Sequence, residues 1–403
     1  MNTSGHETVI RVLIDCTQLP KLKAGLGTYG HNLVRELLAL NTSAFFWIVV
    51  QSDDADMMFD HPHVHVIKAP AKLFRRLPLR FLLEQVYLPW LSWKHSINIL
   101  HSLHYSFPLM PLRARKFVTV HDMTSFGMPD IHISSKGRYY RLFLRIGWRH
   151  ADHMIFVSRS TLKDYLKRFP RSPDSCHITL LGKSGDFRPD ICPESVSRVL
   201  EKYRVGRPYL LFVGMIEPRK NLTRLVRAFA GIAPLYPRHS LVIAGSKGWM
   251  YKTVFEEVRR QNLEGRVLFP GFVAEEDKAY LIRGAEVFVY PSLYEGFGIP
   301  VLEALACGIP TLTSDVSSMP EVAGNAALFC DPFSTEDMRA ALERLVGDGE
   351  LRASLAAEAV LQAQKFDWKL TARETYQAYC TAIAGDSDRR PRNAGKTAYD
   401  SIS

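Results

Sequence analysis

Two glutamates separated by seven residues carry the clearest chemical signal in this sequence. Glu295 and Glu303 belong to the segment Tyr290-Pro-Ser-Leu-Tyr-Glu-Gly-Phe-Gly-Ile-Pro-Val-Leu-Glu303. Pro300 favours the first turn of a helix, where its missing N–H leaves no hydrogen bond unmade. We therefore expect Glu295 in the loop before that helix and Glu303 in its first turn.

The loop between the glutamates favours close contact with a polar ligand. Gly296 and Gly298 flank Phe297, and glycine lets backbone N–H groups approach a ligand closely. A helix N-terminus beside them attracts negatively polarised oxygen atoms. Two carboxylates and several bare amides together suit a polyhydroxylated ligand that carries phosphate, such as a nucleotide sugar.

A second candidate site follows the apolar run 209–213. Gly214 comes next, and Arg219 and Lys220 stand five and six residues later. We expect Asn221 to cap the following helix. A guanidinium can bind phosphate in a bidentate manner and an ammonium acts as a point charge, so the pair matches a diphosphate. The alternative is a solvated loop pair, whose positive charges would oppose the helix dipole.

The N-terminal half holds two further candidates. Gly25 and Gly27 lie in a glycine-rich loop between an expected strand and an expected helix. Such a loop either faces a phosphate or substrate or forms only a tight turn. His121 and Asp122 follow strand residues 117–120, at the carboxyl end where open α/β sheets bind ligands. This histidine is either a functional group or a structural one.

Arginines recur with helical spacing between residues 136 and 150, among aromatic and aliphatic residues. Together with the basic segment 72–80 and the segment that contains Trp90 and Trp93, they give a basic aromatic surface. Surfaces of this kind lie on anionic bilayers. The expected membrane- or acceptor-facing cations are Arg75, Arg76, Arg138, Arg141, Arg145 and Arg149. The alternative is an ordinary helix with a core face and a solvated arginine face. Nucleic acid could use the same cations, but the sequence contains no recognisable nucleic-acid-binding module.

The positive charge is concentrated in the first half of the chain. Residues 1–190 contain 25 Lys and Arg against 15 Asp and Glu, whereas residues 191–403 contain 26 of each. The net charge of +10 therefore belongs to the N-terminal half. This asymmetry indicates an anionic partner for that half.

Short apolar strands alternate with helices throughout, which favours parallel sheets covered on both faces. The expected strands are 9–14, 45–50, 63–67, 97–100, 117–120, 153–157, 209–213, 240–244, 266–269, 286–290 and 310–313. The expected helices are 29–40, 221–233, 251–260, 275–284, 300–307, 338–365 and 370–384. The class is α/β, with two doubly wound Rossmann-like domains facing across a cleft.

Several protein classes are not expected. The first eight residues lack the basic and apolar regions of a signal peptide, and no stretch approaches about 18 uncharged apolar residues. Six cysteines are scattered without a C-x-x-C pair, and His and Cys show no metal-ligand spacing. We expect a cytoplasmic protein with reduced thiols and no metal.

Taken in order, these motifs resemble the retaining glycosyltransferases of family 4, which have the two-domain GT-B fold. The resemblance covers nearly the whole chain and is strongest over residues 208–333. Glu295 and Glu303 match the family's paired glutamates, and 214–221 resembles its diphosphate-binding segment. Residues 366–368 resemble its C-terminal crossover. The resemblance implies an acceptor-binding domain at 1–190, a linker at 191–207, a donor-binding domain at 208–366, a crossover helix at 367–384 and a disordered tail at 385–403.

The resemblance also implies roles on the donor side. Glu303 would bind the ribose hydroxyls, and Glu295 would face the donor sugar or the reacting centre. The amides of residues 296–298 would contact sugar hydroxyls. Arg219 and Lys220 would neutralise the leaving nucleoside diphosphate without a metal or other cofactor.

Further contacts follow from the same resemblance. His121 would contact the donor sugar with support from Asp122, and the loops at Ser246 and Val273 would hold the base. Gly25, Gly27 and Gly214 would line the donor site. One segment, 158–160, departs from the family pattern because an arginine follows its first serine, so its acceptor-side contacts stay undefined.

The implied activity is transfer of a hexose with retention of configuration. The segment around Glu321 and residues 217–221 looks most like bacterial mannosyltransferases of O-antigen or exopolysaccharide synthesis, with GDP-mannose as the implied donor. The acceptor would be a saccharide or a lipid-diphosphate-linked saccharide, reached at the inner face of the cytoplasmic membrane. The alternatives are a nucleotide-sugar epimerase of the same fold and a non-catalytic donor-binding subunit.

Overall fold

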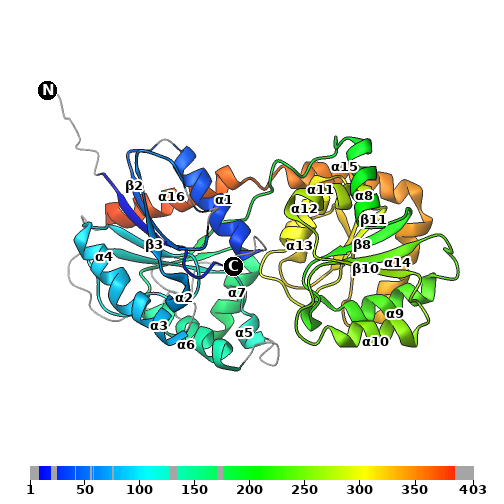
Figure 1. Ribbon diagram of the computed structural model, residues 1–403, viewed down its shortest axis with the longest axis horizontal. Coiled ribbons are helices and arrows are strands. Elements are labelled where there is room, and N and C mark those ends of the chain that lie inside the picture. The colour runs from blue at the N-terminus through cyan, green and yellow to red at the C-terminus, as the bar shows by residue number, and fades with distance from the viewer. Residues whose placement is uncertain are drawn as a thin grey trace, which may run out of the picture. The chain divides into compact units, whose positions relative to one another are not determined.

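The computed structural model describes residues 9–19, 25–40, 42–54, 57, 59–74, 77–127, 134–169 and 176–385. The chain divides into two compact units (Figure 1). The first contains the chain up to Val157, the segment Thr161–Leu180 and the chain from Trp368 onward. The second contains Ser158–Ser160 and Leu181–Asp367.

The first unit is built on a seven-stranded sheet in the order β3-β2-β1-β4-β5-β6-β7. All neighbouring strands run parallel. Their bounds are β1 Arg11–Asp15, β2 Phe45–Gln51, β3 Val64–Ala69, β4 Ile99–Ser102, β5 Arg115–Val120, β6 His153–Phe156 and β7 Cys176–Ile178. The strand order reverses between β1 and β4, which makes their carboxyl ends the switch point of this sheet.

Helices cover both faces of this sheet (Figure 1). One face carries α1 (Leu26–Ala39) and α16 (Trp368–Ala384). The other carries α3 (Leu77–Leu82), the π-helical turn η2 (Leu83–Tyr87), α4 (Leu88–Lys94) and α6 (Ser134–His150). The remaining helices are α2 (Ala71–Phe74), α5 (Thr124–Gly127) and α7 (Arg159–Arg168).

The second unit repeats this architecture with six parallel strands in the order β10-β9-β8-β11-β12-β13. The strands are β8 Tyr209–Val213, β9 Ser240–Ala244, β10 Val267–Gly271, β11 Val287–Tyr290, β12 Thr311–Ser314 and β13 Ala327–Cys330. Every residue of β8 and β11 is buried, as expected for central strands covered on both faces. The switch point lies between these two strands.

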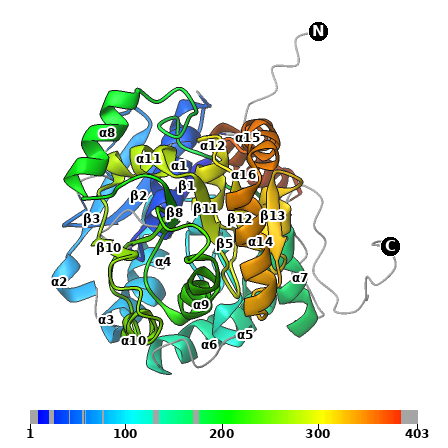
Figure 2. The same cartoon turned by 90° about the vertical axis from the view of Figure 1, so that its right-hand side faces the viewer.

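The helices of the second unit also form two layers around its sheet (Figure 2). They are α8 Pro193–Lys202, α9 Leu222–Ile232, α10 Lys252–Arg260, α11 Glu275–Gly284, α12 Ile299–Ala306, α13 Met319–Ala323, α14 Thr335–Gly347 and α15 Gly349–Ala363. A short 3₁₀ turn, η4 (Pro218–Lys220), precedes α9. No helix among the described residues is both long and apolar enough to cross a bilayer.

The predicted fold class, two doubly wound α/β domains, is confirmed. Several details differ from the expectations. The units divide at Leu180–Leu181 rather than at residue 190, and the expected linker 191–207 contains α8. The expected helix 338–365 is two helices, because Asp348 adopts an extended conformation and caps α15 through Leu351 N–H. Strands β7 and β13 were not expected, and residues 386–403 lie outside the described part.

Helix α16 returns to the first unit and is anchored there by buried hydrogen bonds. The Tyr379 hydroxyl lies 2.6 Å from His101 Nδ1, and His101 Nε2 lies 2.8 Å from the Thr119 hydroxyl. Burial lowers the pKa of His101 to about 3, so its ring is neutral at physiological pH. The crossover helix is thus tied to β4 and β5 through a chain of neutral polar groups.

Removal of the Tyr379 hydroxyl should weaken the first unit. Tyr379→Phe leaves a buried nitrogen of His101 without its partner, and such losses cost about 1–3 kcal/mol. We expect urea unfolding to show a fall of this size. The control on the same helix is Thr381→Ala, because exposed Thr381 bonds only to the carbonyl of Gln377. Equal stability of Tyr379→Phe and the wild type would contradict the anchoring role.

Candidate functional site

The candidate donor site lies at the switch point of the second sheet, where the loops after β8 and β11 meet. Arg219 and Lys220 arrive on the loop after β8, and Glu295 arrives on the loop after β11. The Leu293 N–H donates to the Arg219 carbonyl at 2.8 Å, which joins the two loops through their backbones. Two sites that are separate in the sequence are therefore one site in the structure.

Glu295 binds both cations. Its Oε2 accepts from Arg219 Nη1 at 2.6 Å, and its Oε1 accepts from Lys220 Nζ at 2.5 Å. Lys220 also donates to the Tyr290 hydroxyl, and Arg219 pairs with Glu217 at 2.8 Å. Lys220 and Glu295 are buried. The unfavourable placement of two cations before a helix is therefore offset by carboxylates of the protein itself.

The charges in this cluster fix its ionisation. Burial by itself would raise the pKa of Glu295, but Arg219 and Lys220 outweigh it and lower the pKa to about 2. Burial and the charge of Arg219 lower the pKa of Lys220. Glu295 is thus a carboxylate at any physiological pH, and each of its two oxygens already holds a cation.

Asn221 is the N-cap residue of α9, as expected, but its side chain does not cap the helix. Its φ of 62° is left-handed, and its side chain makes no cap hydrogen bond to α9. Nδ2 instead donates to the carbonyls of Pro291 and Pro332, at 3.1 and 2.6 Å. Asparagine adopts this conformation more readily than most residues. Asn221 therefore ties the loop after β8 to the loop after β11.

Glu303 lies in the second turn of α12 rather than in the first. Its Oε1 accepts from Lys278 of α11 at 2.7 Å, while Oε2 is buried without a hydrogen-bond partner. Burial raises the pKa of Glu303 to about 7, although Lys278 acts against this rise. An unused buried acceptor fits a ligand hydroxyl, since such a group otherwise carries a desolvation penalty.

The glycine loop before α12 is fixed by serine hydroxyls. Ser318 Oγ donates to the carbonyls of Glu295 and Phe297, at 3.1 and 2.8 Å. Ser158 Oγ donates to the carbonyl of Gly296 at 2.6 Å. Gly298 has a φ of 105°, and a side chain there would collide with Met319. These hydrogen bonds hold the carbonyls of residues 295–297, so the loop has a defined conformation.

The remaining donor-side residues lie along the same edge of the second sheet. Gly214 N–H donates to Ala244 at the end of β9, and Ile216 N–H donates to the carbonyl of Ser246. The loop after β10 contains Val273, which is buried. The expected base-binding positions, Ser246 and Val273, thus follow β9 and β10, the two strands on one side of β8.

The segment 158–160, whose sequence departs from the family pattern, binds a carboxylate. The backbone N–H groups of Arg159 and Ser160 donate to Glu321 at 3.0–3.3 Å. Because these contacts use backbone groups, the identity of the Arg159 side chain does not determine them.

His121 and Asp122 follow β5 of the first unit. His121 Nε2 donates to the Leu103 carbonyl at 2.8 Å, and burial lowers the pKa of His121 to about 4. Asp122 Oδ1 accepts from the amide and hydroxyl of Thr124, at 2.9 and 2.5 Å. The carboxylate therefore caps α5, and it acts on His121 through its charge.

Two other sequence candidates lie in the first unit. Gly25 precedes α1 with a φ of 51°, and Gly27 is buried in its first turn. Both lie at the amino end of α1, and the switch-point strand β1 precedes them in the chain. Residues 20–24, between β1 and Gly25, lie outside the described part.

The basic surface is only partly as expected. Arg138, Arg145 and Arg149 are exposed on α6. Arg141 Nη1 instead donates to the Ser125 carbonyl at 3.1 Å. Arg75 and Arg76 lie outside the described residues. No group of three or more His, Cys, Asp or Glu side chains that could hold a metal occurs in the described ranges.

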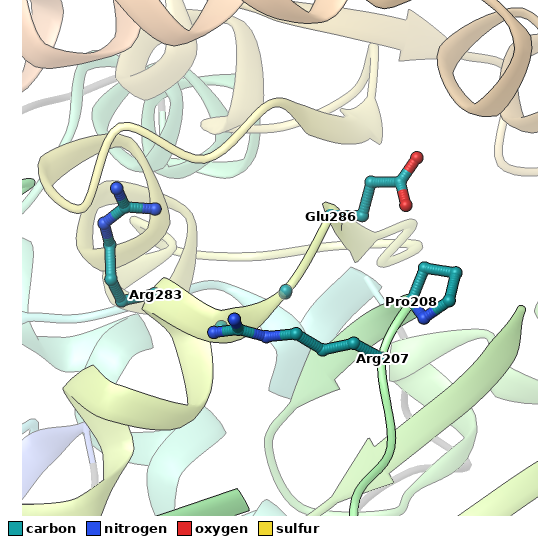
Figure 3. A pocket seen from close by; sticks show the side chains of 6 residues that line it. Arg207, Pro208, Arg283 and Glu286 are labelled. Atoms are coloured by element: carbon teal, nitrogen blue, oxygen red, sulfur yellow. The ribbon is translucent and has the colours of Figure 1, made fainter. Parts of the chain in front are cut away.

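A pocket of about 260 Å³ in the second unit lies at the opposite edge of the sheet (Figure 3). Arg207 and Pro208 line it just before β8, and Arg283 and Glu286 line it just before β11. Glu286 is already bonded to His239 and Arg352. Because open α/β sheets bind ligands at the carboxyl ends of strands, this pocket is separate from the candidate site.

Sequence reasoning missed Lys278, Tyr290, Glu217 and Ser318 as members of the site. Lys278 is 25 residues away from Glu303 in the chain, so no local spacing links them. The Lys220–Tyr290 contact spans 70 residues. Glu217 stands only two residues before Arg219, so the sequence could have indicated this ion pair.

Two family descriptions match the sequence, "Glycosyl transferases group 1" over residues 198–361 and "Glycosyltransferase Family 4" over residues 24–180. O-antigen chain mannosyltransferase B of Escherichia coli is 34% identical over 67% of this chain and 71% of that protein. O-antigen chain mannosyltransferase RfbU of Salmonella typhimurium is 25% identical over 83% of this chain and 90% of that protein. Sucrose-phosphate synthase from Thermosynechococcus elongatus has a similar fold, with a TM-score of 0.74, 21% identity and coverage of 93% of this chain and 100% of that one.

Loss of Glu295 should cost more stability than loss of Lys220. Glu295→Gln leaves buried Lys220 without a counter-charge, which costs about 3–5 kcal/mol. Lys220→Met leaves Glu295 paired with Arg219, so the expected cost is about 1–3 kcal/mol. Urea unfolding of both variants at pH 7 without ligand tests this order. A larger cost for Lys220→Met would show that Glu295 does not hold the cluster together.

Glu303 should make stability fall between pH 5 and pH 8. Its pKa of about 7 lies above the ordinary 4.5, so the folded protein binds this proton more tightly than the unfolded chain. The stabilisation is complete below pH 4.5 and is lost as the pH rises through about 7. Over this range the wild type should lose about 1–3 kcal/mol more than Glu303→Gln.

The measurement is urea unfolding at several pH values. The control is Glu358→Gln, because Glu358 is exposed on α15 and its replacement should leave the wild-type pH dependence unchanged. If Glu303→Gln kept the full pH dependence, another group would have to be responsible.

Proposed function

This chain belongs to the family 4 glycosyltransferases and has their GT-B fold, and we propose that it transfers mannose from GDP-mannose to a saccharide acceptor with retention of anomeric configuration. It is a hexosyltransferase by its family and relatives. The choice of mannose follows the two O-antigen mannosyltransferases described above. The main support for the donor site is that Arg219, Lys220 and Glu295 meet at the switch point. Glu303, on the helix that follows this loop, adds a buried carboxylate with an unused acceptor oxygen.

The cations of the cluster are suited to a diphosphate leaving group. Negative charge builds on the diphosphate as the glycosidic bond breaks, and prepositioned cations stabilise that charge. Arg219 retains 18% side-chain exposure, whereas Lys220 is buried. Arg219 therefore contacts the diphosphate directly, whereas Lys220 acts on it through its charge from a buried position. We propose that these groups do this without a metal or other cofactor.

Glu303 is suited to the ribose. Its Oε1 is held by Lys278, so the free Oε2 can accept a hydrogen bond from a ribose hydroxyl. The amides of Gly296, Phe297 and Gly298 lie just before the same helix and contact the sugar hydroxyls. Gly214, Ser246 and Val273 line the same edge toward the base.

The state of Glu295 favours attack from the leaving-group side. A double displacement needs a free carboxylate as the nucleophile. Both oxygens of Glu295 hold cations, and its low pKa makes it a weak base. We therefore assign Glu295 the role of positioning the cations. In the proposed step the acceptor oxygen bonds to the anomeric carbon as the bond to the diphosphate breaks, and a phosphate oxygen takes the acceptor proton.

The acceptor assignment follows the relatives and the charge of the first unit. The two relatives build O-antigen chains by their names, and residues 1–190 carry all of the net positive charge. We propose a saccharide acceptor of bacterial surface-polysaccharide synthesis, carried on a lipid diphosphate and reached from the cytoplasm. An epimerase or a non-catalytic donor-binding subunit has no comparable support among the relatives.

Donor specificity can be measured directly by thermal shift. GDP-mannose at about 100 times its dissociation constant should stabilise the protein by about 2.7 kcal/mol, and UDP-sugars should not. Glu303→Gln should weaken GDP-mannose binding, while Glu358→Gln should not change it. A shift with UDP-sugars alone would overturn the donor assignment.

Turnover separates the rival classes. With a mannose-terminated oligosaccharide acceptor, the proton NMR spectrum of the product should show an α-linked mannose, and chelation of metals should not slow its formation. Lys220→Met should lower kcat about 10²–10³-fold, as expected for loss of a group that stabilises transition-state charge. Release of an epimer from donor alone, or unchanged activity in Lys220→Met, would overturn the proposal.

A further inference from the structure

The helical run α3–η2–α4 of the first unit is apolar on both faces. Its inner face places Leu83, Leu88 and Leu91 in a buried cluster against the sheet. Its outer face carries five large apolar side chains that are 42–76% exposed: Phe81, Leu82, Val86, Trp90 and Trp93. We call these five residues the apolar face. Such a contiguous exposed apolar patch marks an interaction site.

The apolar face follows helical spacing. Leu82, Val86 and Trp90 are four residues apart, and Trp93 follows three residues later, so these side chains lie along one side of the helix. The π-helical turn at Leu83–Tyr87 lies in the middle of this run. The Tyr87 and Trp90 rings stack at 5.7 Å, and Lys94 lies over the Trp90 ring at 4.8 Å.

A buried polar network fixes this run in place. Glu84 is fully buried on the inner face, where it accepts hydrogen bonds from Ser106 at 2.7 Å and from Tyr139 of α6 at 2.5 Å. Arg80 lies 3.5 Å from the same carboxylate. The apolar face is therefore presented on a rigid support, and α6 is tied beside it.

Helix α6 adds a basic face to this surface. Arg138, Leu142, Arg145 and Arg149 are exposed and follow one another by four, three and four residues. Tyr139, which bonds to Glu84, adjoins Arg138 in the sequence. The hydrogen bond between Tyr139 and Glu84 places α6 beside this run (Figure 1). We call these four residues the basic face.

The charges near the apolar face have one sign. Residues 71–98 contain five basic residues and a single acidic residue, Glu84, which is buried. Lys94 is exposed at the end of this run, and Lys72 is exposed on α2, which precedes it in the chain. An anionic partner would therefore meet positive charge around an apolar centre, whereas two copies of this surface would repel each other.

We propose that the apolar face and the basic face together dock the protein on an anionic lipid bilayer. Tryptophan is enriched at the level of the lipid headgroups, and interfacial helices bury their apolar side there while cations contact anionic lipid. The apolar face enters the interface, and the arginines of α6 bind the headgroups. The inference is independent of the donor and of the acceptor sugar.

Flotation with vesicles tests the proposal. The full chain should float with vesicles of equal parts phosphatidylglycerol and phosphatidylcholine, and much less with phosphatidylcholine alone. Val86→Ser/Trp93→Ser should lower the partition coefficient at least ten-fold. Both side chains are exposed, so the fold should persist. The matched control is Leu235→Ser/Leu361→Ser, which replaces similarly exposed apolar residues of the second unit and should bind normally.

The charge contribution has its own variants. Arg145→Gln/Arg149→Gln should lower binding several-fold and reduce its dependence on salt, because each cation near an anionic surface contributes about 1 kcal/mol. Arg198→Gln/Arg238→Gln removes the same charge from exposed positions of the second unit and should have little effect. Brominated lipids should quench tryptophan fluorescence in the wild type and less in Trp90→Phe/Trp93→Phe.

Three results would overturn the proposal. The first is no flotation with anionic vesicles. The second is equal flotation of wild type and Val86→Ser/Trp93→Ser, which would leave the apolar face without a role. The third is a dimer in sedimentation experiments without lipid that this double variant dissociates, which would assign the surface to a second copy of the chain.

Discussion

The carboxylate of Glu295 lies between two cations at the point where the strand order of the second sheet reverses, and the geometry of the candidate site depends on that arrangement. Lys220 is buried, and a buried ammonium without a counter-charge is strongly destabilising. The loop after β11 must therefore deliver Glu295 to the loop after β8. Asn221 and Ser318 add hydrogen bonds to the same two loops. The cluster thus fixes the backbone of the loop that precedes α12.

The two glutamates of the motif have the same side chain and opposite environments. Glu295 has two cations within 2.6 Å and a pKa of about 2, whereas Glu303 has one and a pKa of about 7. Burial acts on both in the same direction, so the neighbouring charges make the difference: Glu295 has two cations, whereas Glu303 has one cation and the carboxylate of Glu275 nearby. One carboxylate is permanently charged and saturated, and the other keeps an oxygen free. This division suits a charge-holding role for Glu295 and a hydroxyl-binding role for Glu303.

The helical run α3–η2–α4 of the first unit has apolar side chains on both its inner and its outer face. In α3–η2–α4 the inner leucines complete the core, and Glu84 ties α6 alongside. The outer residues add nothing to that core, yet they are large and apolar. Retaining five such side chains at the surface is unfavourable in water alone. In the proposed docking, contact with the apolar part of a bilayer offsets this unfavourable free energy, and the surrounding cations favour anionic lipid.

Periodicity and short-range motifs predicted much of this protein from sequence. Buried central strands read as continuous apolar runs, so β8 and β11 were placed within a residue of their observed bounds, and the doubly wound class followed. The loops that carry Arg219, Lys220 and Glu295 were found because glycine and proline mark strand ends and helix starts. Asn221 stands at the N-cap position of α9, as expected, but without the side-chain cap hydrogen bond, and the single helix expected across 338–365 was wrong. A left-handed residue and one extended aspartate leave no periodic signal. The pairing of Glu295 with Lys220, and of Glu303 with Lys278, spans 75 and 25 residues. The sequence by itself determined which charged groups the loops carry; only the tertiary structure decided which of them meet, because contact across such distances depends on the order of strands in the sheet.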